Sequence, residues 1–173
     1  MQEDLDKNKA NLAGARHAAL GLSKKIGKLS YPITLNSLVE VVKHEFNIVV
    51  APAPKGAFSG KGDALSQIRG DIVFIIYDDE KSIVRKRFSV AHELGHLYLG
   101  HLHGNSSSDL NTDNFDEKEA NAFAAQLLMP PIQLRQDIKL GLKDADKLAA
   151  KYNVSIDAMW WQLSSTGLIN LMY

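Results

Sequence analysis

The segment Arg87-Phe-Ser-Val-Ala-His-Glu-Leu-Gly-His96 decides the fold and the chemistry of this chain. It carries the pattern His-Glu-x-x-His, with ligand candidates His92 and His96, inside a stretch that predicts a helix over about 83–101. Residues four apart on a helix share a face, so the two imidazoles can reach one ion at roughly 2.0–2.1 Å. Glu93 lies about 100° round the helix, beside the open position of such an ion. There it can take a proton from a metal-bound water and pass it to a leaving amine.

Apolar residues flank the motif on two sides of the helix, which is typical of a buried helix. One stripe contains Phe88, Ala91, Gly95 and Leu99, and the other contains Val90, Leu94 and Leu97. Two buried imidazoles need polar partners, and a metal ion supplies them. The alternative is a buried helix that carries two histidines by chance.

A second predicted helix, over about 115–129, offers the third ligand. Its apolar stripe starts at Ala120, and Glu117 falls on the same stripe three residues earlier. A carboxylate directed into a core is costly unless it is paired or bound to a metal. Asn121 shares the face of Glu117 and can orient a ligand histidine, whereas Glu119 points about 200° away. We therefore predict Glu117 as the ligand; the alternative is an exposed acid favoured by the helix dipole.

The other patterns predict an α+β fold. An amphipathic helix ends near Asn47, and strands follow at 48–51 and 71–77. Because strands and helices do not alternate, we expect a small antiparallel sheet packed against a helical layer. The segment 144–167 reads as two short helices with a turn between them, which resembles a helix-turn-helix.

The domain organisation follows from these patterns. We expect a single domain over residues 31–173, with the helical tail 131–173 packed on it. Residues 1–30 are rich in Lys and Ala and form either a helix or a mobile arm.

Composition excludes several classes of protein. The chain has 173 residues, no cysteine, and 20 basic against 20 acidic side chains. Without cysteine, disulfides and thiolate metal sites are impossible, so any metal is held by His and carboxylates. A net charge of zero argues against a protein that grips nucleic acid through its phosphates. No apolar segment is suited to a signal peptide or a membrane span, so we expect a cytoplasmic protein that contacts no membrane.

Two segments, Arg87-Phe-Ser-Val-Ala-His-Glu-Leu-Gly-His-Leu97 and Glu117-Lys-Glu-Ala-Asn-Ala-Phe-Ala-Ala-Gln-Leu-Leu-Met-Pro130, resemble the ImmA/IrrE family of metallopeptidases. The resemblance implies a zincin-like domain with a compact three-stranded sheet. It implies Zn²⁺, or another divalent transition metal, at His92, His96 and Glu117, with Glu93 as the general base. It also implies a target, a helix-turn-helix repressor of the phage or stress-response kind, and some relatives act in toxin–antitoxin pairs.

We therefore expect a zinc-dependent endopeptidase that cleaves a repressor or an antitoxin by attack of a metal-bound water. The alternative is a non-proteolytic toxin or partner-binding protein whose metal site is structural or vestigial. The presence of Glu93 favours the enzyme, because a purely structural site needs no base. A DNA-binding regulator that uses the tail is disfavoured by the neutral charge. The oligomeric state is left open.

Several other side chains have more than one interpretation. His101 and His103 either stabilise an oxyanion or interact with carbonyls at the helix end. Tyr98 and Tyr152 are further oxyanion candidates. The basic run 85–87 is either solvated surface or a site that binds substrate or a partner.

Overall fold

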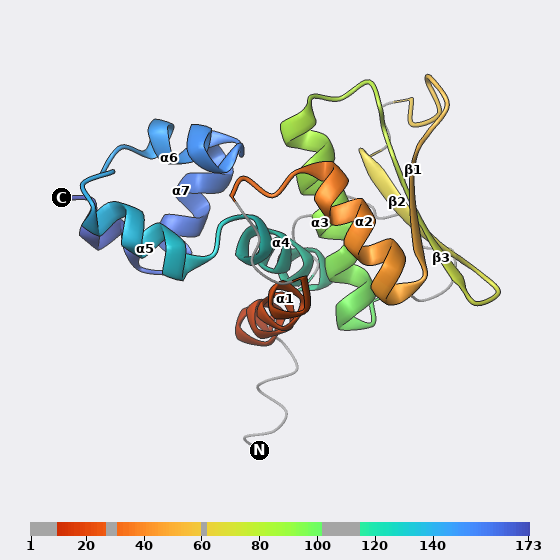
Figure 1. Ribbon diagram of the computed structural model, residues 1–173, viewed down its shortest axis with the longest axis horizontal. Helices are drawn as coiled ribbons and strands as arrows, with labels where there is room; N and C mark the ends of the chain where they lie inside the picture. Colours follow the sequence, from red (N-terminus) through yellow and green to blue (C-terminus); the bar gives the residue numbers. More distant parts are fainter. Residues whose placement is uncertain (1–9, 27–30, 60–61, 102–114) are drawn as a thin grey trace, which may run out of the picture.

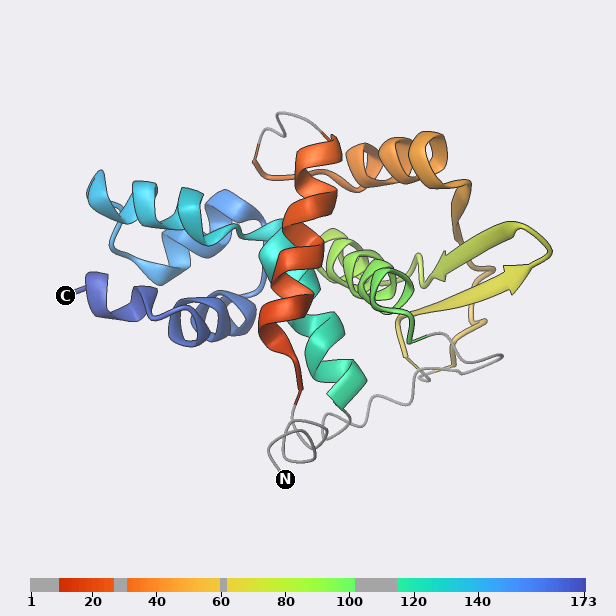
Figure 2. The ribbon, with the colours of Figure 1, turned by 90° about the horizontal axis from the view of Figure 1, so that it is seen from below.

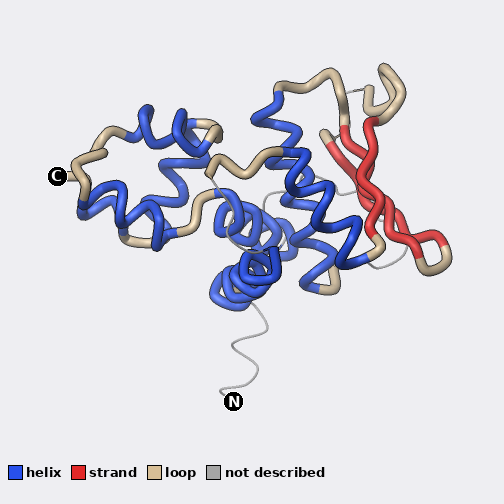
Figure 3. Tube along the Cα trace, in the orientation of Figure 1, coloured by secondary structure: helices blue, strands red, loops and turns tan. Residues whose placement is uncertain are grey.

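The computed structural model describes residues 10–26, 31–59, 62–101 and 115–173 (Figure 1). The fold is α+β, as expected, with all described strands in one sheet at one end of the molecule (Figure 3). The elements are α1 (Leu12–Ile26), α2 (Leu35–Phe46), β1 (Ile48–Pro52), β2 (Ala64–Arg69), β3 (Ile72–Tyr77), α3 (Ile83–Leu99), α4 (Phe115–Leu128), α5 (Pro131–Lys139), α6 (Ala145–Tyr152), α7 (Ile156–Ser165) and a 3₁₀ turn at Leu168–Leu171.

The sheet is mixed, so the expectation of an antiparallel sheet is wrong for one of its two pairings. The strand order is β1-β3-β2, in which β2 is antiparallel to β3 and β1 is parallel to it. The chain runs along β1, back along β2 and forward again along β3, so β1 and β3 share a direction. Because β3 inserts between its two predecessors, strands with the same direction become neighbours, which local sequence patterns do not reveal.

The strand β2 has no clear apolar pattern, because it places a serine on the buried face of the sheet. Ala64 and Ser66 are buried there, whereas Ile68 is exposed. Its partner on β3 opposite Ser66 is the fully buried Ile75. A single polar residue therefore sits in an otherwise apolar face, and its role emerges at the site described below.

Helix α3 lies between the sheet and α4, and α1 crosses over α4 (Figure 2). Ser82 caps the start of α3 by accepting a hydrogen bond from the Arg85 amide at 3.3 Å. Gly100 ends α3 in the left-handed region with φ 74°, where its amide bonds the carbonyls of His96 and Leu97. A residue with a Cβ is strained in this conformation, so glycine is suited to this position.

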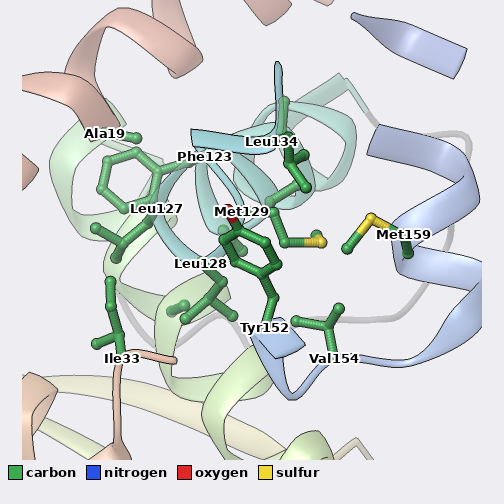
Figure 4. Packing of buried hydrophobic residues seen from close by; sticks show 14 of the residues in the cluster. Ala19, Ile33, Phe123, Leu127, Leu128, Met129, Leu134, Tyr152, Val154 and Met159 are labelled. Carbon is green, nitrogen blue, oxygen red and sulfur yellow. The ribbon is translucent and has the colours of Figure 1, made fainter. Parts of the chain in front are cut away.

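One hydrophobic core joins α1, α3, α4 and the tail. Figure 4 shows the part of this core where α1, α4 and the tail meet. Ala15, Ala19 and Leu22 bring α1 into this core, and Tyr152 and Met159 bring in the tail.

Of the two alternatives for residues 1–30, the structure has a helix at 12–26; residues 1–9 lie outside the described part. Within the described ranges, no helix combines the length and apolar character that crossing a membrane requires.

Arg87 departs from the expectation of a solvated basic run, because its side chain is only 1% exposed. Its guanidinium donates to the carbonyls of Ile33 at 2.6 Å, Tyr152 at 3.3 Å and Asn153. Burial lowers the pKa of Arg87 to about 10, so it stays charged at neutral pH. It ties α3 to the segment before α2 and to the end of α6. The neighbouring Arg85 is exposed, as expected.

The crossing of α3 and α4 predicts the effect of adding one methyl group. A Cβ on Gly95 would lie 3.0 Å from Ala120 Cα, 3.1 Å from its carbonyl oxygen and 3.2 Å from Phe123 Cβ. We expect Gly95→Ala to lower the free energy of unfolding by about 1–3 kcal/mol, as overpacking does. Urea denaturation measures this change.

Gly21→Ala is the matched control, because Gly21 also lies within a helix but a Cβ there would meet nothing within 4 Å. This variant should be stabilised by about 0.5–1 kcal/mol. If Gly95→Ala were as stable as Gly21→Ala, the close approach of the two helices would not constrain the fold.

Candidate metal centre

Two helices bring the three predicted ligands together. Among the described residues, His92 and His96 of α3 and Glu117 of α4 form a group whose ligand atoms all lie within 4.8 Å of one another. Glu117 Oε2 is 3.1 Å from His92 Nε2, and Glu117 Oε1 is 3.1 Å from His96 Nε2. The two Nε2 atoms are 2.9 Å apart. All three side chains are buried, and their ligand atoms face one another.

The contacts of the two histidine Nδ1 atoms indicate that the Nε2 atoms are the ones available to bind a metal. His92 Nδ1 lies 3.0 Å from Asn121 Oδ1, an acceptor, so Nδ1 carries the proton and Nε2 presents a lone pair. His96 Nδ1 likewise faces away from the group and contacts His101. Two imidazole nitrogens and a carboxylate are a donor set that suits zinc, and no thiolate competes. The residues therefore fit a zinc ion held by His92, His96 and Glu117.

The charges at the site favour an ionised carboxylate. Burial alone would raise the pKa of Glu117, but hydrogen bonds with His92 and His96, and their charge, bring it down to about 2. Burial alone would lower the pKa of His92, but the hydrogen bond and charge of Glu117 outweigh it and raise this pKa. Glu117 is thus an anion at neutral pH, which is the form that binds a cation.

Glu93 is buried beside this group and is held by a residue that sequence reasoning missed. Ser66 Oγ donates to Glu93 Oε2 at 2.5 Å, across from β2 to α3. This explains why β2 has a serine on its buried face. The only sequence signal is that Ser66 lies between Ala64 and Ile68 on one face of the strand. This signal identifies no partner until the strand is placed against α3.

A cleft of about 630 Å³ opens onto the site. It is bounded by the start of β2, the first half of α3 and the connection from α6 to α7. Four polar residues of the site line it, namely His92, Glu93, Glu117 and Asn121, and its apolar wall is formed by Ala64, Val84, Phe88, Val154 and Ala158. The chemistry-bearing side chains therefore face a space large enough for a segment of peptide.

The two tyrosines that were candidates for stabilising an oxyanion, Tyr98 and Tyr152, lie outside the described lining of the cleft. Tyr98 packs against Phe46 and Phe123, and the buried Tyr152 donates its hydroxyl to Asp137 at 2.9 Å.

The two histidines after the motif have different outcomes. Among the described residues, the side chain of His101 contacts His96 and Glu119, and it is absent from the described lining of the cleft. His103 lies outside the described residues. Glu119 is directed to His101 and not to the group of Glu117.

Residues 44–163, most of the chain, match the model of the Peptidase M78 family, the IrrE N-terminal-like domain. The chain belongs to this family of metallopeptidase domains, and the resemblance seen in the sequence is confirmed. No curated protein matches the chain.

Among solved structures, a Mycobacterium tuberculosis transcriptional regulator is similar, with a TM-score of 0.63 and 18% identity. The match covers 92% of this chain and 49% of the regulator, so this chain spans about half of the regulator's length. At this identity the likeness concerns the fold alone.

The site predicts the metal content of the purified protein. We expect about one zinc ion per chain, because one N,N,O donor set is present in the described residues. His92→Ala should lose the ion, whereas His17→Ala should keep it, because His17 is exposed on α1 and outside the group. Elemental analysis after reconstitution measures both. A wild-type protein that neither contains nor rebinds metal would contradict the assignment.

Proposed function

We propose that this member of the Peptidase M78 family is a zinc-dependent endopeptidase. The observation that carries the proposal is the convergence of His92, His96 and Glu117 on one point, with Glu93 held next to them in the same cleft. A metal site with no chemical role needs no further ionisable side chain facing the same space. In this chain the further ionisable side chain is Glu93. It is buried, accepts a hydrogen bond from Ser66 and lines the cleft.

The roles of the side chains follow from their positions. Zinc bound there would supply a Lewis acid for the scissile carbonyl and lower the pKa of the attacking water. Glu93 accepts the proton from that water and later donates it to the leaving amine. Ser66 holds one carboxylate oxygen of Glu93, and the other oxygen would take the proton. Asn121 fixes the ring of His92 from behind.

The substrate is proposed to bind as an extended peptide along β2. This strand pairs only with β3 among the described strands, so one of its edges is open to a further strand. Ala64 at its start lines the cleft, and Ser66, two residues on, contacts Glu93. A peptide added to this edge would therefore lay its carbonyl groups beside the metal ligands.

We propose a helix-turn-helix repressor or an antitoxin as the protein substrate. The support is the resemblance to the ImmA/IrrE family, whose model matches most of the chain. Such a substrate places the reaction in the cytoplasm. We propose no DNA-binding role for the helix-turn-helix-like tail. Val154 and Ser155, which lie between its two helices, line the cleft.

The competing proposal is a non-proteolytic toxin or partner-binding protein with a structural metal site. The Ser66–Glu93 hydrogen bond favours the enzyme. It holds a carboxylate at the cleft without adding a ligand to the metal group, and a structural site gains nothing from that arrangement.

Replacing the proposed base separates proteolysis from metal binding. The test incubates the zinc-loaded protein with helix-turn-helix repressors, beginning with any that is encoded beside its gene, and identifies the products by mass spectrometry. Wild type should give a discrete cut. Glu93→Gln should slow cleavage by about 10²–10⁴-fold, because the amide accepts no proton, while its zinc content stays unchanged.

Two controls make the result decisive. A chelator should abolish cleavage and added zinc should restore it. Glu93→Gln cleaving at the wild-type rate would exclude Glu93 as the base. A zinc-loaded wild type that leaves the repressor and a panel of antitoxins intact would favour the non-proteolytic protein.

A further inference from the structure

A second polar contact supports the metal group through His101, which is not part of the described lining of the cleft. His96 Nδ1 lies 3.2 Å from His101 Nδ1, and His101 Nε2 lies 3.2 Å from Glu119 Oε2. The side chain of His101 is 9% exposed and that of Glu119 is 17% exposed. Asp116 is a more distant neighbour, 3.8 Å from His101 Nε2. His96, His101 and Glu119 therefore form a line of mostly buried side chains leading outward from the metal group.

The direction of the hydrogen bonds in this line is set by the ligand. When His96 offers the lone pair of Nε2 to a metal, its Nδ1 carries the proton and must donate it. Nδ1 of His101 then accepts, so the proton of His101 resides on Nε2, which faces the carboxylate of Glu119. Each donor along the line meets an acceptor, and this single arrangement matches metal binding by His96 through Nε2.

The far end of the line is fixed to another part of the fold. Glu119 Oε1 accepts a hydrogen bond of 2.6 Å from the backbone amide of Asn11, immediately before α1. Both oxygens of Glu119 are thus engaged, one by His101 and one by the start of α1. Helix α1 lies outside the residues matched by the family model, which start at 44. The support of His96 therefore uses a segment outside the residues that the family model matches.

The two histidine ligands are supported in different ways. His92 contacts the side chain of Asn121 directly, from the same helix that carries Glu117. His96 has no such amide partner among the described residues and instead contacts a second imidazole. A ligand ring that has lost its outer hydrogen bond can rotate and change tautomer, which weakens metal binding.

We propose that His101 and Glu119 are positioning residues that hold His96 in the orientation and tautomer needed to bind the metal. Neither residue belongs to the described lining of the cleft or to the group of three ligands. The proposal rests on the metal site of the proposed function, but it does not depend on proteolysis. Its test is therefore a metal-binding measurement that requires no substrate.

The experiment compares His101→Leu with His101→Gln. Leucine fills space but accepts no hydrogen bond, so zinc affinity, measured by competition with a chromogenic chelator, should fall about 10–100-fold. Glutamine offers an amide oxygen to His96 Nδ1 and an amide N–H to Glu119, so it should recover most of this loss. In cobalt-substituted protein, the visible spectrum of His101→Leu should differ from that of wild type, whereas His101→Gln should resemble wild type.

Glu119→Ala tests the outer member of the line. It should weaken zinc binding in wild type, but by a smaller factor in the His101→Leu background, because the line is already broken there. A purely structural role predicts instead that the zinc affinities of the two histidine variants track their metal-free melting temperatures, with no rescue by glutamine.

Two results would overturn the proposal: wild-type zinc affinity and cobalt spectrum in His101→Leu, or equal losses in the leucine and glutamine variants. These outcomes are distinct from failure of the proposed function. A wild type that binds zinc and cleaves nothing would remove the peptidase and leave the role of His101 intact. Normal cleavage by a His101→Leu protein with unchanged zinc affinity would remove the role of His101 and leave the peptidase intact.

Discussion

The close crossing of α3 and α4 at Gly95 is the contact on which the rest of this structure depends. Gly95 directly precedes His96, and Ala120, which it meets, follows Glu117 by three residues. Without a side chain at position 95, α4 approaches α3 until the carboxylate of Glu117 reaches both imidazoles at 3.1 Å. One missing methyl group thus sets the distance between the helices and, through it, the geometry of the metal group.

Around this crossing, polar side chains from distant parts of the chain hold the chemical groups in place. Ser66 comes from the sheet, and His101 and Glu119 lead to α1. Arg87 bonds carbonyls before α2 and after α6, which holds the tail against α3. Buried polar groups of this kind are stable only when they are paired, so each contact constrains the element that provides its partner. The tail forms one wall of the cleft. The position of this wall therefore depends on α3, the helix that carries the motif.

Helical spacing predicts much of the convergence. His92 and His96 are four apart, and Glu117 lies on the buried stripe of the next helix. The choice of Glu117 over Glu119 also uses Asn121, which shares the face of Glu117, and the family resemblance. The parallel direction of β1 was not predictable in this way, because strand insertion is a property of the whole sheet. Nor were Ser66 and Arg87, whose partners lie 27 and 54 residues away in sequence. Local patterns specify faces, and only packing brings faces from distant segments together.

The most direct measurement is anomalous X-ray diffraction from crystals of the zinc-loaded protein, collected at the zinc absorption edge. The account predicts one peak bounded by His92 Nε2, His96 Nε2 and an oxygen of Glu117, with each bond at roughly 2.0–2.2 Å. A zinc ion bound elsewhere would contradict it. So would a peak ligated by Glu119 with Glu117 turned to solvent.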